Sequence, residues 1–96
     1  MKTDAKVQYC DGESGAPIVS LTREQAAECS HQGACDEDVA ANLDRVQWHA
    51  DDATLRRMLK GYGAWDDLAE ASTDTLRSRA LWLAAGDIVE NPGDYD

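Results

Sequence analysis

The sequence predicts a mainly α-helical α+β domain, with about four helices preceded by a short N-terminal β-hairpin. Three observations favour this class: apolar residues at helical spacing through most of the chain, two strand-like segments separated by turn formers, and a length that fits one core. The 43% of hydrophobic residues, which include three tryptophans, indicate that the chain folds despite its high charge. We expect a single domain over residues 1–96, divided into a hairpin (6–21), a helical part (22–90) and a polar tail (91–96).

The hairpin is predicted from two short segments around a turn. Residues 6–10 alternate weakly, and residues 18–21 begin with two β-branched side chains. Residues 11–17 between them contain glycine, serine, aspartate and proline, which are typical of turns. Because two strands alone are marginally stable, this hairpin needs another element to pack on.

A capping box marks the start of the first helix. Thr22 is followed three residues later by Gln25, so each side chain can bond the main-chain amide of the other residue. This helix is expected to run to about Ser30. A second helix is predicted to open at residues 36–38, whose carboxylates favour the positive end of a helix dipole, and to end near residues 45–46. Its predicted apolar face consists of Val39, Ala40 and Leu43.

The third helix has a continuous apolar stripe. Asp51 or Asp52 is expected to cap it, and Gly61 and Gly63 are expected to stop it. The apolar residues at i, i+3, i+4 and i+7 are Leu55, Met58, Leu59 and Tyr62. The basic residues on the opposite face, expected to neutralise neighbouring carboxylates, are Arg56, Arg57 and Lys60.

The longest helix is predicted near the C-terminus. A short helical piece over 64–70 leads to a cap at Ser72 or Thr73, and the long helix covers roughly 74–90 before Asn-Pro-Gly at 91–93 ends it. The residues that pin the short piece are Trp65 and Leu68. The main stripe of the long helix consists of Leu76, Ala80, Leu83 and Ala84, widened by Leu81, Ala85 and Ile88. So broad an apolar surface predicts that this helix is central.

The net negative charge limits the classes of molecule that the protein can bind. Nineteen Asp and Glu residues oppose nine Lys and Arg, which gives a formal net charge of -10 and a pI of about 4.4. Such a surface repels nucleic acid and acidic lipid and attracts basic protein surfaces, so we expect neither direct nucleic-acid binding nor membrane binding. Twelve of these carboxylates form four groups: Asp36, Glu37 and Asp38; Asp51 and Asp52; Asp66, Asp67 and Glu70; and Asp87, Glu90, Asp94 and Asp96.

No motif for nucleophilic catalysis, phosphate binding or calcium binding is found in the sequence, so we expect a non-enzymatic protein without a cofactor. Paired carboxylates at helix starts are explained more simply as caps. Zinc is an alternative, because thiolates and imidazole suit it, although the C-x-H-x3-C spacing matches no common zinc finger. The alternative zinc ligands are Cys10, Cys29, His31 and Cys35.

No apolar segment suggests targeting to a membrane. The N-terminus is polar and leads into no hydrophobic stretch of a signal peptide, and the longest apolar run, residues 80–85, is too short to span a bilayer. A cytoplasmic protein with reduced cysteines is therefore expected.

Three segments of the chain resemble those of small uncharacterised proteins of proteobacterial phages and other mobile elements. They are residues 29–39 (CSHQGACDEDV), 61–68 (GYGAWDDL) and 81–88 (LWLAAGDI). In size, acidity and lack of catalytic motifs, the chain also resembles the anti-CRISPR class, whose members share no motif. The resemblance implies a stoichiometric inhibitor that binds a host defence complex, and it assigns no residues.

Charge and resemblance together predict an acidic inhibitor that binds a basic surface of a host nucleic-acid-binding complex. Its carboxylates would imitate the phosphates of DNA, which carries one charge per roughly 1.7 Å of helix axis. The expected contact residues are Asp36, Glu37, Asp38, Asp51, Asp52, Asp66, Asp67 and Glu70, with exposed Trp48 or Trp65 as apolar anchors. Two alternatives stay open: a small zinc-stabilised interaction module, and a soluble accessory protein whose charge only keeps it in solution.

Overall fold

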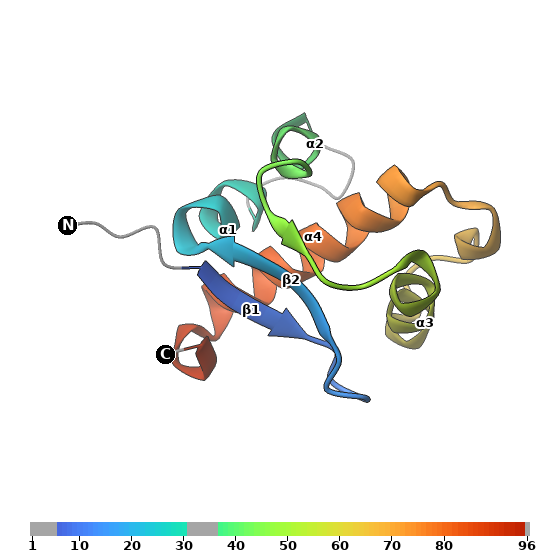
Figure 1. The fold of residues 1–96 in the computed structure, drawn as a ribbon, viewed down its shortest axis with the longest axis horizontal. Coiled ribbons are helices and arrows are strands. Elements are labelled where there is room, and N and C mark those ends of the chain that lie inside the picture. The colour runs from blue at the N-terminus through green and yellow to red at the C-terminus, as the bar shows by residue number, and fades with distance from the viewer. Residues whose placement is uncertain (1–5, 31–36, 96) are drawn as a thin grey trace.

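One long helix, α4 (Thr73–Glu90), crosses the molecule, and the other elements pack around it (Figure 1). The computed structural model describes residues 6–30 and 37–95, apart from the side chain of Asp38. The other elements are β1 (Lys6–Cys10), β2 (Pro17–Thr22), α1 (Arg23–Ser30), α2 (Glu37–Asn42), β3 (Gln47–Trp48), α3 (Asp52–Tyr62) and the 3-10 helices η1 (Leu68–Glu70) and η2 (Pro92–Tyr95). The predicted class, mainly α with a short N-terminal sheet, is confirmed.

The core lies where α4 meets the sheet and the other helices. Every residue of the predicted α4 stripe is buried, and so are the residues that widen it. They pack with buried side chains of β2 and α3, among them Ile18, Leu21, Leu55 and Leu59. Helix α4 contacts α1, α2, α3, β2 and η2, so its predicted central position is confirmed.

Strands β1 and β2 form the predicted antiparallel hairpin, in which Val7 lies opposite Leu21. The buried carboxylate of Asp11 holds its turn, because it accepts a hydrogen bond from the Ser14 hydroxyl at 2.8 Å and another from the Glu13 amide at 3.3 Å. The Ser14 hydroxyl is the main reason why the pKa of Asp11 lies below its usual value. The turn is therefore fixed by an aspartate rather than by glycine alone.

A third strand, β3, was not predicted. It pairs antiparallel with β2, with Trp48 opposite Val19 and Gln47 opposite Ser20, and completes a sheet in the order β1-β2-β3. Two residues are too few to show the alternation of polar and apolar side chains by which a strand is recognised in sequence.

The predicted helix caps are confirmed. The amide of Gln25 donates to Thr22 Oγ1 at 3.1 Å, and the amide of Thr22 donates to Gln25 Oε1 at 2.8 Å. Asp51 caps α3 and Ser72 caps α4, each accepting from the amide three residues later, at 2.9 and 3.2 Å. Gly63 ends α3 with a φ of 80°, in the left-handed region that favours glycine.

Helix α2 is shorter than predicted. It ends at Asn42 and not near residues 45–46, because the Asn42 carbonyl accepts from the amides of both of those residues in a tight turn. Val39 is buried as predicted, but Ala40, placed on the same apolar face, is exposed. This short helix directs only part of the predicted stripe toward the core.

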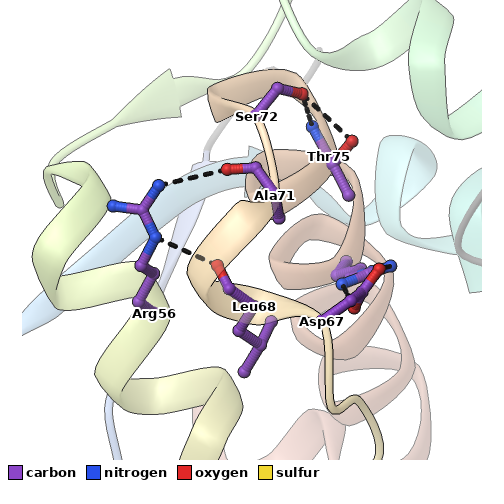
Figure 2. A network of polar contacts seen from close by, with 7 residues as sticks. Arg56, Asp67, Leu68, Ala71, Ser72 and Thr75 are labelled. Atoms are coloured by element: carbon purple, nitrogen blue, oxygen red, sulfur yellow. Dashed lines mark hydrogen bonds and ion pairs between the residues drawn. The ribbon is translucent and has the colours of Figure 1, made fainter.

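Two predictions for α3 are wrong. Tyr62 is 62% exposed, because it is the last residue of α3 and its ring stacks outside the core on Trp65, with a centroid distance of 6.2 Å. Arg56 forms no ion pair with any carboxylate that the structure describes. Its guanidinium donates to the main-chain carbonyls of Leu68 and Ala71, each at 3.1 Å, and so ties η1 to α3 (Figure 2).

The segments on either side of α4 also differ from expectation. Of the helical piece predicted over 64–70, only the η1 turn is helical, pinned as expected by buried Leu68 and half-buried Trp65. The predicted polar tail contains η2, in which half-buried Tyr95 packs on the core and donates a hydrogen bond to Asp87. No helix in the described ranges is both long enough and apolar enough to cross a bilayer.

Candidate functional site

Five of the predicted contact residues gather at one end of the molecule, which we call the acidic end: Asp51, Asp52, Asp66, Asp67 and Glu70. The first two stand at the start of α3, the next two lie in the loop after α3, and Glu70 ends η1. Thr73, the first residue of α4, donates a hydrogen bond to Asp52 at 2.6 Å, so the starts of α3 and α4 lie together. Helix α1 lies toward the opposite end of the molecule (Figure 1).

Two aspartates of the acidic end hold the helix starts. Asp51 accepts from the Thr54 amide, and hydrogen bonding to Thr54 holds the pKa of Asp51 below its usual value. Half-buried Asp52 accepts from Thr73 and joins the two helices. Substitution of either residue would therefore lower the stability of the fold as well as change the surface charge.

The loop after α3 contains one paired carboxylate and two unpaired ones. Asp67 binds the Arg79 guanidinium through two hydrogen bonds of 2.7 and 3.1 Å (Figure 2), which lower the pKa of Asp67. Asp66 and Glu70 are exposed, and the side chain of neither forms a hydrogen bond or ion pair with another described residue. These two side chains are the ones that a partner can contact without disturbing the fold.

Three arginines of α3 and α4 point inward, whereas Arg57 is exposed and its charge acts on Asp51. Arg56 binds main-chain carbonyls, as described above, and Arg79 is only 8% exposed, with its guanidinium 5.3 Å from the centre of the Trp65 ring. Half-buried Arg77 lies over the Trp48 ring at 5.4 Å. These cations stabilise the interior. The exposed side chains of Asp66 and Glu70 form no ion pair with a described cation.

The other predicted acidic residues that the structure describes do not join the acidic end. Glu37 is exposed at the start of α2, a separate part of the surface (Figure 1), whereas Asp36 and the side chain of Asp38 lie outside the described residues. The group formed by Asp87, Glu90 and Asp94 lies on the C-terminal part of α4 and on η2, and its last member, Asp96, is also outside the described residues. The predicted carboxylates within the described ranges thus occupy separate regions and not one continuous surface.

The two tryptophans predicted as exposed anchors are half-buried, so this prediction is wrong. The Trp48 indole N–H donates to the Leu43 carbonyl at 2.9 Å. Trp65 contacts Tyr62 in a stacked arrangement and Trp82 edge to face, with 6.3 Å between the two indole centres. Both rings pack on the core because large aromatic surfaces gain most from burial. The exposed aromatic side chain in this region is instead Tyr62.

The alternative zinc ligands are only partly within the described residues. Cys29 is fully buried in α1, and half-buried Cys10 ends β1, while His31 and Cys35 lie outside the described residues. Over the described ranges, no three His, Cys, Asp or Glu side chains come close enough to hold a metal ion. Cys29 belongs to the apolar core, where it acts as a small hydrophobic residue.

One pair of potentially reactive residues was missed by the sequence analysis. The hydroxyl of buried Ser20 lies 2.8 Å from His49 Nε2, across the β2–β3 edge of the sheet. A serine nucleophile needs a histidine that is itself oriented by a third group, and among the residues described no carboxylate bonds His49. We therefore interpret the pair as a cross-strand contact. Its only sequence signal would have been strand β3, which is too short to detect.

Comparisons with protein-family models, with curated proteins and with solved structures found no match to this chain.

Proposed function

We propose that the protein is a non-enzymatic, cytoplasmic inhibitor that binds a basic surface of a host nucleic-acid-binding complex and blocks nucleic-acid access there. An anti-CRISPR protein, or a DNA mimic, would act in this way. The observation that carries the proposal is the acidic end, where carboxylates from α3, η1 and the loop between them lie together while Arg56 and Arg79 point inward. Exposed carboxylates of this kind attract basic grooves and accelerate association with them.

The rigidity of the acidic end supports the same proposal. Arg56 fixes η1 through two carbonyls, and Arg79 fixes the loop through Asp67. Asp66 and Glu70 are therefore presented from a segment that is already ordered. A preordered segment loses less conformational entropy when it binds, which favours recognition by charge.

Affinity capture tests the proposal. The immobilised protein would be incubated with nuclease-treated lysate of a proteobacterial host, and the bound proteins identified by mass. The informative variant carries Asp66→Lys and Glu70→Lys, because both side chains are exposed and have no structural partner among the described residues. The matched control carries Glu24→Lys and Glu28→Lys, the same change of charge on exposed positions of α1.

We expect a nucleic-acid-binding complex to be retained by the wild type and by the α1 control, lost with the acidic-end variant, and released as salt rises. Equal capture by both variants would contradict the proposal. Capture of nothing specific would favour the accessory protein whose charge serves solubility. Capture that depends on added zinc would favour the zinc-stabilised module.

A further inference from the structure

A hollow of about 390 Å³ with aromatic walls lies on the side of the molecule formed by β1 and the C-terminal parts of α3 and α4. Tyr9, Tyr62 and Trp82 supply its rings, and Gly86 is among the residues that line it. Tyr62 is 62% exposed, so a partner can reach its ring. The hollow is separate from the acidic end, since no acidic-end residue lines it.

Two carboxylates of α4 border the same hollow. Exposed Glu90 lies over Gly86, where a Cβ atom would stand 3.9 Å from Glu90 Oε2, and the Glu90 side chain forms no hydrogen bond with another described residue. Asp87 accepts hydrogen bonds from Asn91 and Tyr95, which hold it in place. Its charge also acts on Tyr9, whose pKa is raised mainly by burial and then by Asp87. Aromatic rings and negative charge therefore face one space.

One arginine of this chain already contacts an aromatic ring and a carboxylate together. Arg79 lies over the Trp65 ring while its guanidinium forks onto the Asp67 carboxylate, which combines an aromatic face with an acid. The hollow offers the same combination on the surface, and no lysine or arginine is among the described residues that line it. A planar guanidinium stacks on aromatic rings and forks onto carboxylates better than an ammonium group does.

We infer that this hollow receives an arginine side chain of a partner protein, with the guanidinium against Tyr62 and Trp82 and its N–H groups toward Glu90. The inference deepens the proposed function, on which it rests for the basic nature of the partner. It adds a second, separate contact that is specific for an arginine side chain, whereas the acidic end attracts any positively charged surface.

The direct test is an NMR titration of the isotope-labelled protein with N-acetyl-arginine methylamide as the probe. We expect saturable shifts of the Gly86 amide and of the Trp82 indole N–H. The uncharged analogue N-acetyl-citrulline methylamide should bind roughly tenfold more weakly, because it forms neither the cation–π contact nor the ion pair. Absence of saturable shifts, or equal binding of citrulline or of the matching lysine derivative, would overturn the inference.

Two variants locate the contact without endangering the fold, since both residues are exposed. Glu90→Gln and Tyr62→Ala should each weaken arginine binding roughly two- to fivefold. The control is Asp44→Asn, an exposed carboxylate outside the hollow whose loss changes the net charge equally. If Glu90→Gln weakens binding no more than Asp44→Asn does, the inference is wrong. Failure of the Asp66 and Glu70 capture experiment would leave this titration unaffected, so the two proposals fail separately.

Discussion

Replacing Arg56 with methionine is expected to lower the free energy of unfolding by about 2 kcal/mol. Methionine keeps the apolar stem of the side chain but removes the two hydrogen bonds to the carbonyls of Leu68 and Ala71, each 3.1 Å long. A net contribution of about 1 kcal/mol for each bond is appropriate, because Arg56 is half-buried and water reaches part of the site. For a chain of this size, such a loss lowers the Tm by roughly 8–16 °C.

Arg57→Met is the matched control. Arg57 is the neighbouring residue on α3, is exposed, and forms no hydrogen bond with another described residue, so its replacement should change stability by less than about 0.5 kcal/mol. Urea unfolding of both variants, followed by tryptophan fluorescence and circular dichroism, gives the comparison. Equal stability of the two variants would show that the Arg56 hydrogen bonds do not hold η1 against α3.

Three further predictions concern the core, pH and metal. Leu83→Ala should lower the free energy of unfolding by about 2–3 kcal/mol, because Leu83 is only 8% exposed, and urea unfolding that shows no loss would contradict its place in the core. Arg79 lowers the pKa of folded Asp67, so this pair stabilises the protein above the unfolded-state pKa of Asp67 and loses that contribution as pH falls through the folded-state value. Asp67→Asn should therefore be less stable than the wild type at neutral pH, with the difference vanishing in acid; a constant difference in thermal melts would oppose this. Excess EDTA should leave the Tm unchanged, since an apolar core holds the fold, and unfolding by EDTA would revive the zinc alternative.

The parts of the fold that depend on neighbours in sequence could be predicted. The capping box of Thr22 and Gln25 and the stripe of α4 are local patterns, and each corresponds to a definite hydrogen bond or buried face. The hairpin turn was found in the same way, from its cluster of turn-forming residues. Such features need no knowledge of what lies across the molecule.

The parts that depend on tertiary contacts could not be predicted. Charge alone suggested that Arg56 would pair with a carboxylate, but its partners are carbonyls that approach only when η1 folds against α3. Helical spacing placed Tyr62 in the core, although the helix ends there and its ring turns to Trp65. The aromatic hollow combines residues of β1, α3 and α4, so its members share no local pattern.

The candidate site was predicted in part for the same reason. The acidic residues were evident from composition, but the sequence did not indicate which of their side chains would form hydrogen bonds or ion pairs within the fold. Asp51, Asp52 and Asp67 prove to be structural, whereas Asp66 and Glu70 have no partner among the described residues. This division decides which substitutions test function and which test stability.

Competition with DNA on a purified CRISPR effector complex would show whether the acidic end blocks nucleic-acid access. The complex would be loaded with fluorescently labelled target DNA at low salt and titrated with the wild type, with the Asp66→Lys, Glu70→Lys variant and with the Glu24→Lys, Glu28→Lys control. We predict that the wild type and the α1 control displace the DNA, that the acidic-end variant does not, and that displacement weakens steeply as salt rises. Displacement that is equal for all three proteins, or binding that leaves the DNA in place, would contradict it.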